Sequence, residues 1–254
     1  MSGAGAAPAF DAMELTGRAR THVLQFAQPR FAARREVAGA FLALRAAALD
    51  DGIDLLPIAS FRPFDAQVRI WNRKFSGAAP LYDRDGRPRD FAALAPAEVV
   101  RAILGWSGLP GASRRHWGTD IDVFDRAALP PGYKTRLLPD EVAPGGVFVR
   151  LHAWLDRHIE RYGFYRPYRS DRGGMYPEPW HLSHAASAQA ALAAYRAYGV
   201  DVLAQVVGAS DMLGRELVLS MLPEIFAKHV LNEDPPSAAA LGAVPDGAFV
   251  ERCP

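Results

Sequence analysis

The sequence predicts an α+β protein, in which a small, mostly antiparallel sheet is flanked by helices and followed by additional C-terminal helices. Segments with helical spacing of apolar residues are mixed with short strand-like runs. Their order lacks the regular βαβ alternation that is typical of a parallel sheet. No internal repeat and no clean linker divides the 254 residues, so we expect a single domain.

Three helices and one strand are predicted in the first part of the chain. Apolar residues at helical spacing, together with strong helix formers, predict a helix over 36–49. The short apolar run at 53–60 predicts a strand, and its Pro57 indicates an edge or an irregularity. Further helices are predicted over 64–75 and 96–106, the second because a proline opens it and an acidic residue follows in its first turn.

The rest of the chain continues this mixed order. Alternation predicts a strand over 119–124, and the Pro- and Gly-rich stretch 127–146 is expected to be irregular. An amphipathic pattern that ends at a glycine predicts a helix over 147–163. A strand-like piece follows at 177–184, and Ala-rich helices are predicted over 185–231. These elements give a core of about 36–185, a helical extension of about 186–231, and loose ends at 1–12 and 233–254.

The composition argues against two classes of partner. The 29 basic and 28 acidic residues give a net charge of +1, and no basic stripe alternates with aromatic residues, so we expect no binding to nucleic acid. No apolar run reaches the length of about 18 residues that a membrane-spanning helix needs, and the N-terminus lacks the features of a signal peptide. The sequence as given therefore predicts a cytoplasmic protein, or one of the cell envelope or periplasm if a leader has been removed.

The segment SRRHWGTDID at 113–122 contains the first candidate site. His116, Asp120 and Asp122 are of the types that bind Zn²⁺ in catalytic sites, where three protein ligands leave one position open for water. A histidine and an aspartate a few residues apart are also common in charged surface turns. On these residues alone, both interpretations stay open.

The segment EPWH at 178–181 contains the second candidate site. In the functional interpretation, His181 is a metal ligand, Glu178 acts as general base beside the metal-bound water, and Trp180 packs in the core. The alternative is a strand end with a solvated glutamate and a capped histidine. His184 is a further imidazole nearby, for which we expect a supporting or structural role.

A third candidate lies in SFRPFDAQ at 60–67. Arg62 stands at the end of a short predicted strand, where its planar guanidinium can hold a substrate carboxylate. The alternative is an ordinary surface arginine. The segment YRPYRSDRGG at 165–174 is interpreted either as a flexible binding rim or as a solvated loop.

Taken in order along the chain, these segments resemble the VanY-type D-alanyl-D-alanine carboxypeptidases. This family belongs to a group of zinc peptidases that includes the lysostaphin-type enzymes and the hedgehog signalling domain. The group has the pattern S-x-H-x-x-G-x-A-x-D, followed far downstream by E-x-W-H. The resemblance covers roughly residues 36–185, and the matching positions are Ser113, Gly118 and Asp122 for the first pattern and Glu178, Trp180 and His181 for the second.

The first zinc histidine of this pattern falls on Arg115, and the histidine of this chain stands one residue later, at His116. Arginine stays charged near neutral pH and cannot serve as an ordinary metal ligand. A bulge that turns His116 inward is our working prediction. Otherwise Asp120 or His184 completes the ligand set, or the site has lost its metal and the protein is a non-catalytic relative.

The resemblance implies a zinc-dependent carboxypeptidase or dipeptidase that hydrolyses the C-terminal peptide bond of peptidoglycan stem peptides ending in D-alanine. Two alternatives stay open: a catalytically inactive relative that binds such peptides, and a cytoplasmic peptidase that recycles small peptides. For the enzyme, the predicted Zn²⁺ ligands are His116, Asp122 and His181, the general base is Glu178, and the residues that contact the substrate are Arg62, Gln67 and Ser113.

Overall fold

The computed structural model describes residues 10–243, which contain a four-stranded antiparallel sheet and a separate two-stranded hairpin. In the larger sheet the strand order is β3-β4-β6-β5. These sheets and the helices around them confirm the α+β class. The strands are β1 (Leu24–Ala27), β2 (Arg30–Ala33), β3 (Leu55–Ala59), β4 (Asp120–Asp125), β5 (Phe164–Tyr165) and β6 (His181–His184).

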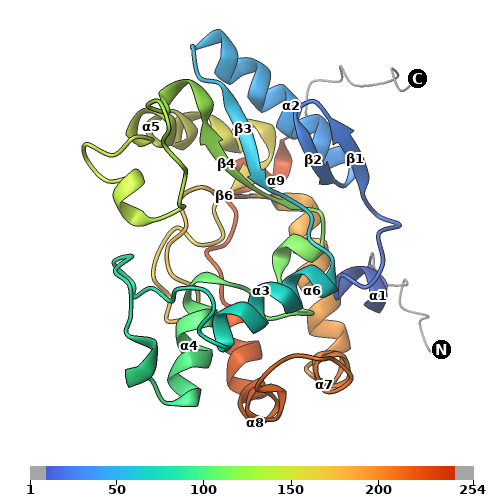
Figure 1. The fold of residues 1–254 in the computed structure, drawn as a ribbon. Coiled ribbons are helices and arrows are strands. Elements are labelled where there is room, and N and C mark those ends of the chain that lie inside the picture. The colour runs from blue at the N-terminus through green and yellow to red at the C-terminus, as the bar shows by residue number, and fades with distance from the viewer. Residues whose placement is uncertain (1–9, 244–254) are drawn as a thin grey trace, which may run out of the picture.

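Helices surround the sheet and make up most of the C-terminal part of the described chain (Figure 1). A 3₁₀ helix over Arg114–His116 precedes β4 and contains the histidine of the first candidate site. The α-helices are α1 (Ala12–Leu15), α2 (Arg35–Asp50), α3 (Phe64–Phe75), α4 (Pro96–Trp106), α5 (Val149–His158), α6 (Ala185–Tyr198), α7 (Asp201–Gly208), α8 (Arg215–Ile225) and α9 (Ala238–Gly242).

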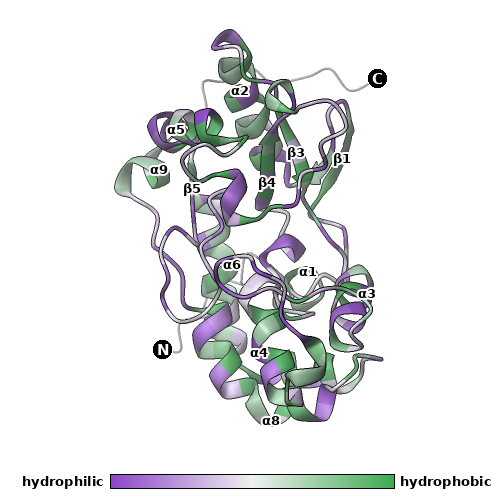
Figure 2. Ribbon diagram, turned by 60° about the vertical axis from the view of Figure 1, so that its left-hand side comes forward, coloured by the Kyte–Doolittle hydropathy of each residue, from purple (hydrophilic) through white to green (hydrophobic). Residues whose placement is uncertain are grey.

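Two hydrophobic clusters hold these elements together. One packs α2 and α5 against the sheet and includes Phe41, Ile121 and Leu155. The other joins α4 to the C-terminal helices and includes Ile103 and Leu203. Figure 1 shows the sheet, α2 and α5 in the upper half and α3, α4, α7 and α8 in the lower half. Figure 2 shows hydrophobic residues in both halves, so each half has its own apolar packing.

Several predicted elements have the expected bounds. Helices α3 and α4 cover 64–75 and 96–106, as the sequence predicted. Glu98 supports the start of α4, because its carboxylate accepts a hydrogen bond of 2.9 Å from the Ala95 amide. Strand β3 lies at the edge of the sheet and its register shifts after Pro57, so both expectations for this proline are met. The helix predicted over 147–163 consists of α5 and a 3₁₀ turn that ends at Gly163, with a left-handed φ of 77°.

Two features differ from the predictions. The β1–β2 hairpin was not predicted, because its strands are only four residues long. The predicted loose ends are ordered within the described residues: Phe10 is buried in the core, and α9 forms near the C-terminus. The remainder of those ends, 1–9 and 244–254, lies outside the described residues.

Over residues 10–243, no helix combines the length and apolar character needed to cross a membrane.

Candidate active site

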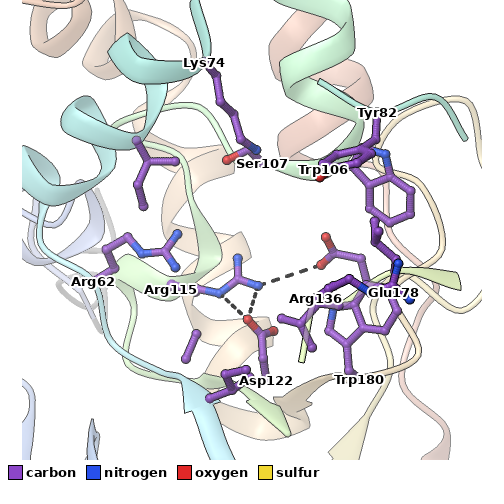
Figure 3. Close-up of a pocket in the computed structure, with 15 residues that line it drawn as sticks. Arg62, Lys74, Tyr82, Trp106, Ser107, Arg115, Asp122, Arg136, Glu178 and Trp180 are labelled. Carbon is purple, nitrogen blue, oxygen red and sulfur yellow. Dashed lines mark hydrogen bonds and ion pairs between the residues drawn. The ribbon is translucent and has the colours of Figure 1, made fainter. Parts of the chain in front are cut away.

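A cavity of about 350 Å³ opens between the sheet and helices α3 and α4 (Figure 3). Its walls combine charged groups with an aromatic surface. The indole rings of Trp106 and Trp180 stack with centroids 6.2 Å apart. Charged side chains reach the cavity from α3, from the 3₁₀ helix, from β4 and from the segment before β6. The polar and aromatic residues that line it include Arg62, Lys74, Tyr82, Trp106, Ser107, Arg115, Asp122, Arg136, Glu178 and Trp180.

Two residues that line the cavity, Asp122 and Glu178, form a group of metal-ligand types with His181. One ligand atom from each of Asp122, Glu178 and His181 lies within 4.8 Å of the others, and all three residues are buried. Asp122 and His181 are partners in the β4–β6 ladder, so their side chains lie on the same face of the sheet. Glu178 is fixed just before β6, because its amide donates a 2.9 Å hydrogen bond to the Tyr168 carbonyl.

Carboxylates contact both ring nitrogens of His181. Nε2 lies 2.8 Å from Asp120 Oδ1, and Nδ1 lies 3.1 Å from Glu178 Oε2 and 3.2 Å from Asp122 Oδ1. Burial alone would lower the pKa of His181, but the hydrogen bonds with Asp120 and Glu178 outweigh burial and raise it. The imidazole is therefore held in one orientation, and its protonated form is favoured.

Arg115 places its guanidinium inside this group. Its Nε donates a 2.9 Å hydrogen bond to Asp122 Oδ2, and its Nη2 donates to the same oxygen. Nη2 also lies 3.3 Å from His181 Nδ1 and 3.9 Å from Glu178 Oε2. Figure 3 shows the guanidinium between Asp122 and Glu178. The residue is only 7% exposed, so this is a buried ion pair.

These contacts decide whether the group fits a metal ion. Asp122, Glu178 and His181 are ligand types that Zn²⁺ takes. A divalent cation between them would meet the guanidinium of Arg115, which cannot lose its proton in a protein. A metal ion would also have to compete with Asp120 and Glu178 for the ring nitrogens of His181, because both nitrogens face these carboxylates. The arrangement seen here therefore fits a guanidinium and does not fit a metal ion.

The structure places His116 away from this group, so it does not bring the three predicted ligands His116, Asp122 and His181 together. Its Nδ1 lies 2.6 Å from the Arg62 carbonyl, and its Nε2 accepts a 3.1 Å hydrogen bond from the Gly111 amide. The ring is fully buried, and burial lowers the pKa of His116 to about 4. A 3₁₀ helix stands where a bulge was expected, and its three residues per turn point Arg115 and His116 in different directions.

Neither of the other predicted substitutes completes a ligand set. Asp120 lies behind His181, where it accepts hydrogen bonds from Arg114 Nε at 2.9 Å and from Thr119. Burial would raise the pKa of Asp120, but the charge of Arg114 outweighs it and lowers the pKa. His184 lies at the other end of β6, with Nδ1 3.1 Å from Ser187 Oγ.

Of the three residues that were predicted to contact the substrate, one lines the cavity and two are buried beside it. Arg62 lines the cavity, and its Nη1 donates a 2.8 Å hydrogen bond to Gln67 Oε1. Gln67 is fully buried and donates to the Gly108 carbonyl at 2.7 Å, so it holds Arg62 and does not itself line the cavity. Ser113 is also buried and does not line the cavity. The structure thus brings only Arg62 to the place where a ligand would lie.

The segment 165–174 is part of the site and is only partly a solvated loop. The ring of Tyr168 meets His181 edge to face, with centroids 5.1 Å apart, and its hydroxyl pKa is raised by burial. Behind it, Glu233 accepts hydrogen bonds from Arg114, from Tyr165 at 3.0 Å and from Gln189 at 2.8 Å. A residue from the predicted loose C-terminal end is therefore bound to the back of the site.

Sequence reasoning missed three of the groups in or behind the site: Lys74, Glu233 and the cavity-facing Trp106. Lys74 follows the cavity-lining Ile70 by four residues on α3, and this helical spacing is a signal that could have indicated it. Trp106 ends α4, and its indole donates a 3.0 Å hydrogen bond to the Asp83 carbonyl. No local pattern connects Glu233 with Arg114, because 119 residues separate them.

Comparisons with known proteins show what this chain is similar to. An uncharacterized protein of Haemophilus influenzae is 30% identical over 125 residues, which are 48% of this chain and 93% of that protein. A solved structure of VanYB in complex with D-alanine-D-alanine is 17% identical, with a TM-score of 0.50, and the match covers 71% of this chain and 86% of that chain. A mutant of the vancomycin resistance D,D-pentapeptidase VanY, in complex with Zn(II), is 19% identical with a TM-score of 0.48. That match covers 68% of this chain and 84% of the other chain.

A family model also matches this chain, and its description is VanY, D-alanyl-D-alanine carboxypeptidase. The match extends over residues 30–187, which is more than half of the chain. It includes the cavity and all three members of the buried group, but not the helices that follow α6 or Glu233. From this match, together with the sheet and the site, we conclude that the chain belongs to the VanY family of D-alanyl-D-alanine carboxypeptidases.

Proposed function

We propose that this chain is a non-catalytic member of the VanY family, which binds peptides through their free C-terminal carboxylate and does not hydrolyse them. The observation that carries the proposal is the position of Arg115 in the buried group of Asp122, Glu178 and His181. Removing a buried guanidinium from its carboxylate partner costs several kcal/mol, so a metal ion would have to overcome that cost to enter.

The loss of metal chemistry leaves a cavity that is suited to an anion. Arg62 has no carboxylate within 4.0 Å of its guanidinium among residues 10–243, and Gln67 holds it by one of its nitrogens. Its other nitrogens are free to donate to a ligand carboxylate. Arg115 Nη1 likewise makes no hydrogen bond within the described chain, and it can donate to a second ligand oxygen.

The class of ligand follows from the shape of the cavity and from the family. At about 350 Å³ the cavity lies at the small end of ligand sites, which suits the last one or two residues of a peptide. Trp106 and Trp180 provide an apolar wall for side-chain or backbone contact. The similar VanYB structure holds D-alanine-D-alanine, which makes this dipeptide the first ligand to test.

One observation favours a second candidate function, the zinc carboxypeptidase that the sequence predicts. Asp122, Glu178 and His181 still lie within 4.8 Å of one another, and all three ligand types occur in zinc hydrolases. For this function, the Arg115 side chain would have to leave the group and another ligand would have to enter.

A gain-of-function variant separates the two candidates. Arg115→His removes the guanidinium and places a histidine where the zinc-peptidase pattern has one. We expect the wild type to retain no stoichiometric zinc after dialysis and to release no D-alanine from D-alanyl-D-alanine, while it binds the dipeptide in calorimetry. The Arg115→His variant should acquire zinc, whereas Arg126→His, at an exposed arginine beside β4, should not.

The results that would overturn the proposal are equally concrete. Stoichiometric zinc in the wild type, together with zinc-dependent release of D-alanine, would establish the enzyme. If Arg115→His acquires no zinc, Arg115 is not what keeps metal out of the group. If the wild type binds no peptide with a free carboxylate, the cavity has another ligand.

A further inference from the structure

We propose that the cavity selects peptides that carry a second carboxylate next to the C-terminal one, and that Lys74 is the residue that recognises it. This inference rests on the proposed binding of peptide C-termini and names the class of ligand more narrowly. Lys74 lies on the cavity wall opposite the buried group of Asp122, Glu178 and His181. The sequence patterns of the family do not include this residue.

Lys74 is placed as a ligand-binding residue. It lies on α3, and both it and Ile70, one turn earlier, line the cavity. Figure 3 shows its side chain extending from α3 into the cavity. Within residues 10–243, its ammonium has no carboxylate within 4.0 Å and makes no hydrogen bond, in contrast to Lys228, which pairs with Glu224 at 2.9 Å.

The acidic groups of the cavity are already engaged elsewhere. Asp122 binds Arg115 through two hydrogen bonds, and Glu178 lies 3.1 Å from His181 Nδ1. Arg136, at the rim, pairs with Asp140 outside the cavity. Among the cations that line the cavity, Lys74 and Arg62 are thus the two without an acidic partner in the described part of the chain, and they face the same space. Electrostatic complementarity favours a ligand with one acid for each.

The environment of these two cations supports the same conclusion. Burial, together with the neighbouring charge of Arg115, lowers the pKa of Arg62 to about 10. Burial likewise lowers the pKa of Lys74 to about 8, against the opposing effect of Glu178. Half-buried cations of this kind are costly without a partner, and a bound anion would offset that cost.

The size of the cavity limits where the second acid can be. A space of about 350 Å³ accommodates only a short piece of peptide. If Arg62 binds the terminal carboxylate, the acid that reaches Lys74 belongs to the last residue or to its neighbour. The expected ligand is therefore a peptide end with an acidic residue at one of these two positions.

Calorimetry with matched dipeptides tests the inference. Alanyl-glutamate and glutamyl-alanine are compared with alanyl-glutamine and glutaminyl-alanine, each as D- and L-forms, near pH 7. We expect the wild type to bind at least one acidic dipeptide about tenfold more tightly than its amide counterpart. The preference should disappear in Lys74→Met and persist in Lys74→Arg. It should also persist in Arg73→Met, a change at an exposed position on the same helix.

Each other outcome has a definite meaning. Equal affinity for acids and amides in the wild type would overturn the inference and leave the proposed binding function intact. A preference for acidic dipeptides that persists in Lys74→Met would show that a residue other than Lys74 binds the second carboxylate. Absence of binding for these dipeptides and for D-alanyl-D-alanine alike would remove the proposed function, and this inference with it. Thermal melting of each variant shows whether it is folded.

Discussion

Replacing Arg115 by methionine should strongly destabilise the protein, because it leaves a buried carboxylate without its cation. Asp122 is 1% exposed and receives two hydrogen bonds from the guanidinium, and Glu178 lies within ion-pair distance of it. Breaking a buried pair by removing one partner typically costs about 3–5 kcal/mol. For a chain of this length, this corresponds to a fall in melting temperature of roughly 6–20 °C.

Urea unfolding followed by circular dichroism, in a buffer with a chelator, measures this loss. The matched control is Arg126→Met, which removes an arginine whose side chain is 64% exposed and which pairs with Asp54. An exposed pair is worth at most about 1 kcal/mol, so the control should change little. Adding Asp122→Asn to Arg115→Met removes the unpaired charge and should recover on the order of 1 kcal/mol.

A specific result would refute this reasoning. If Arg115→Met is no less stable than Arg126→Met, the guanidinium is not a buried partner of Asp122 in solution. Arg115 would then not keep a metal ion out of this group, and the wild type should bind zinc.

The remaining predictions concern His116, Glu233 and Arg62. Burial lowers the pKa of His116 from 6.5 to about 4, so the unfolded chain binds more protons and stability falls as the pH drops through this range. His116 should lower the free energy of unfolding by about 2 kcal/mol between pH 7 and 5. Urea unfolding of His116→Gln should lack this decrease. Glu233→Gln weakens three partly buried hydrogen bonds and should cost about 1–3 kcal/mol in thermal melting, whereas Glu224→Gln, at an exposed pair, should cost little. Arg62→Lys keeps the charge but loses the planar fork, so calorimetry should show about tenfold weaker binding of D-alanyl-D-alanine; unchanged affinity would mean that Arg62 does not hold the carboxylate.

The fold and part of the site could be predicted where local patterns determine them. Helices α3 and α4 follow from apolar spacing and from a proline start, and their bounds agree with the prediction. Asp122 and His181 meet because β4 and β6 pair in register, and Glu178 is only three residues before His181. The short link between Arg62 and Gln67 lies within one segment of sequence.

The rest depends on geometry that the sequence pattern does not contain. Whether Arg115 or His116 faces the cavity is decided by a 3₁₀ turn where a bulge was equally compatible with the residues. Lys74 reaches the cavity only because α3 packs beside it, and Glu233 reaches Arg114 across 119 residues. Contacts of this kind are set by tertiary packing and leave no local periodicity.

The buried group also explains how a guanidinium can stand where the zinc-peptidase pattern has a metal ligand. Asp122 and Glu178 bring two negative charges into a buried site, and such charges need compensation. Arg115 supplies one positive charge, whereas a zinc ion would supply two. The hydrogen bonds with Asp120 and Glu178 outweigh burial and raise the pKa of His181, which favours a second positive charge on its ring. Arg114, which pairs with Asp120 and Glu233, offsets part of the negative charge behind it. Exchanging Arg115 alone therefore changes the charge state of the whole group, which is why Arg115→His tests metal binding and stability together.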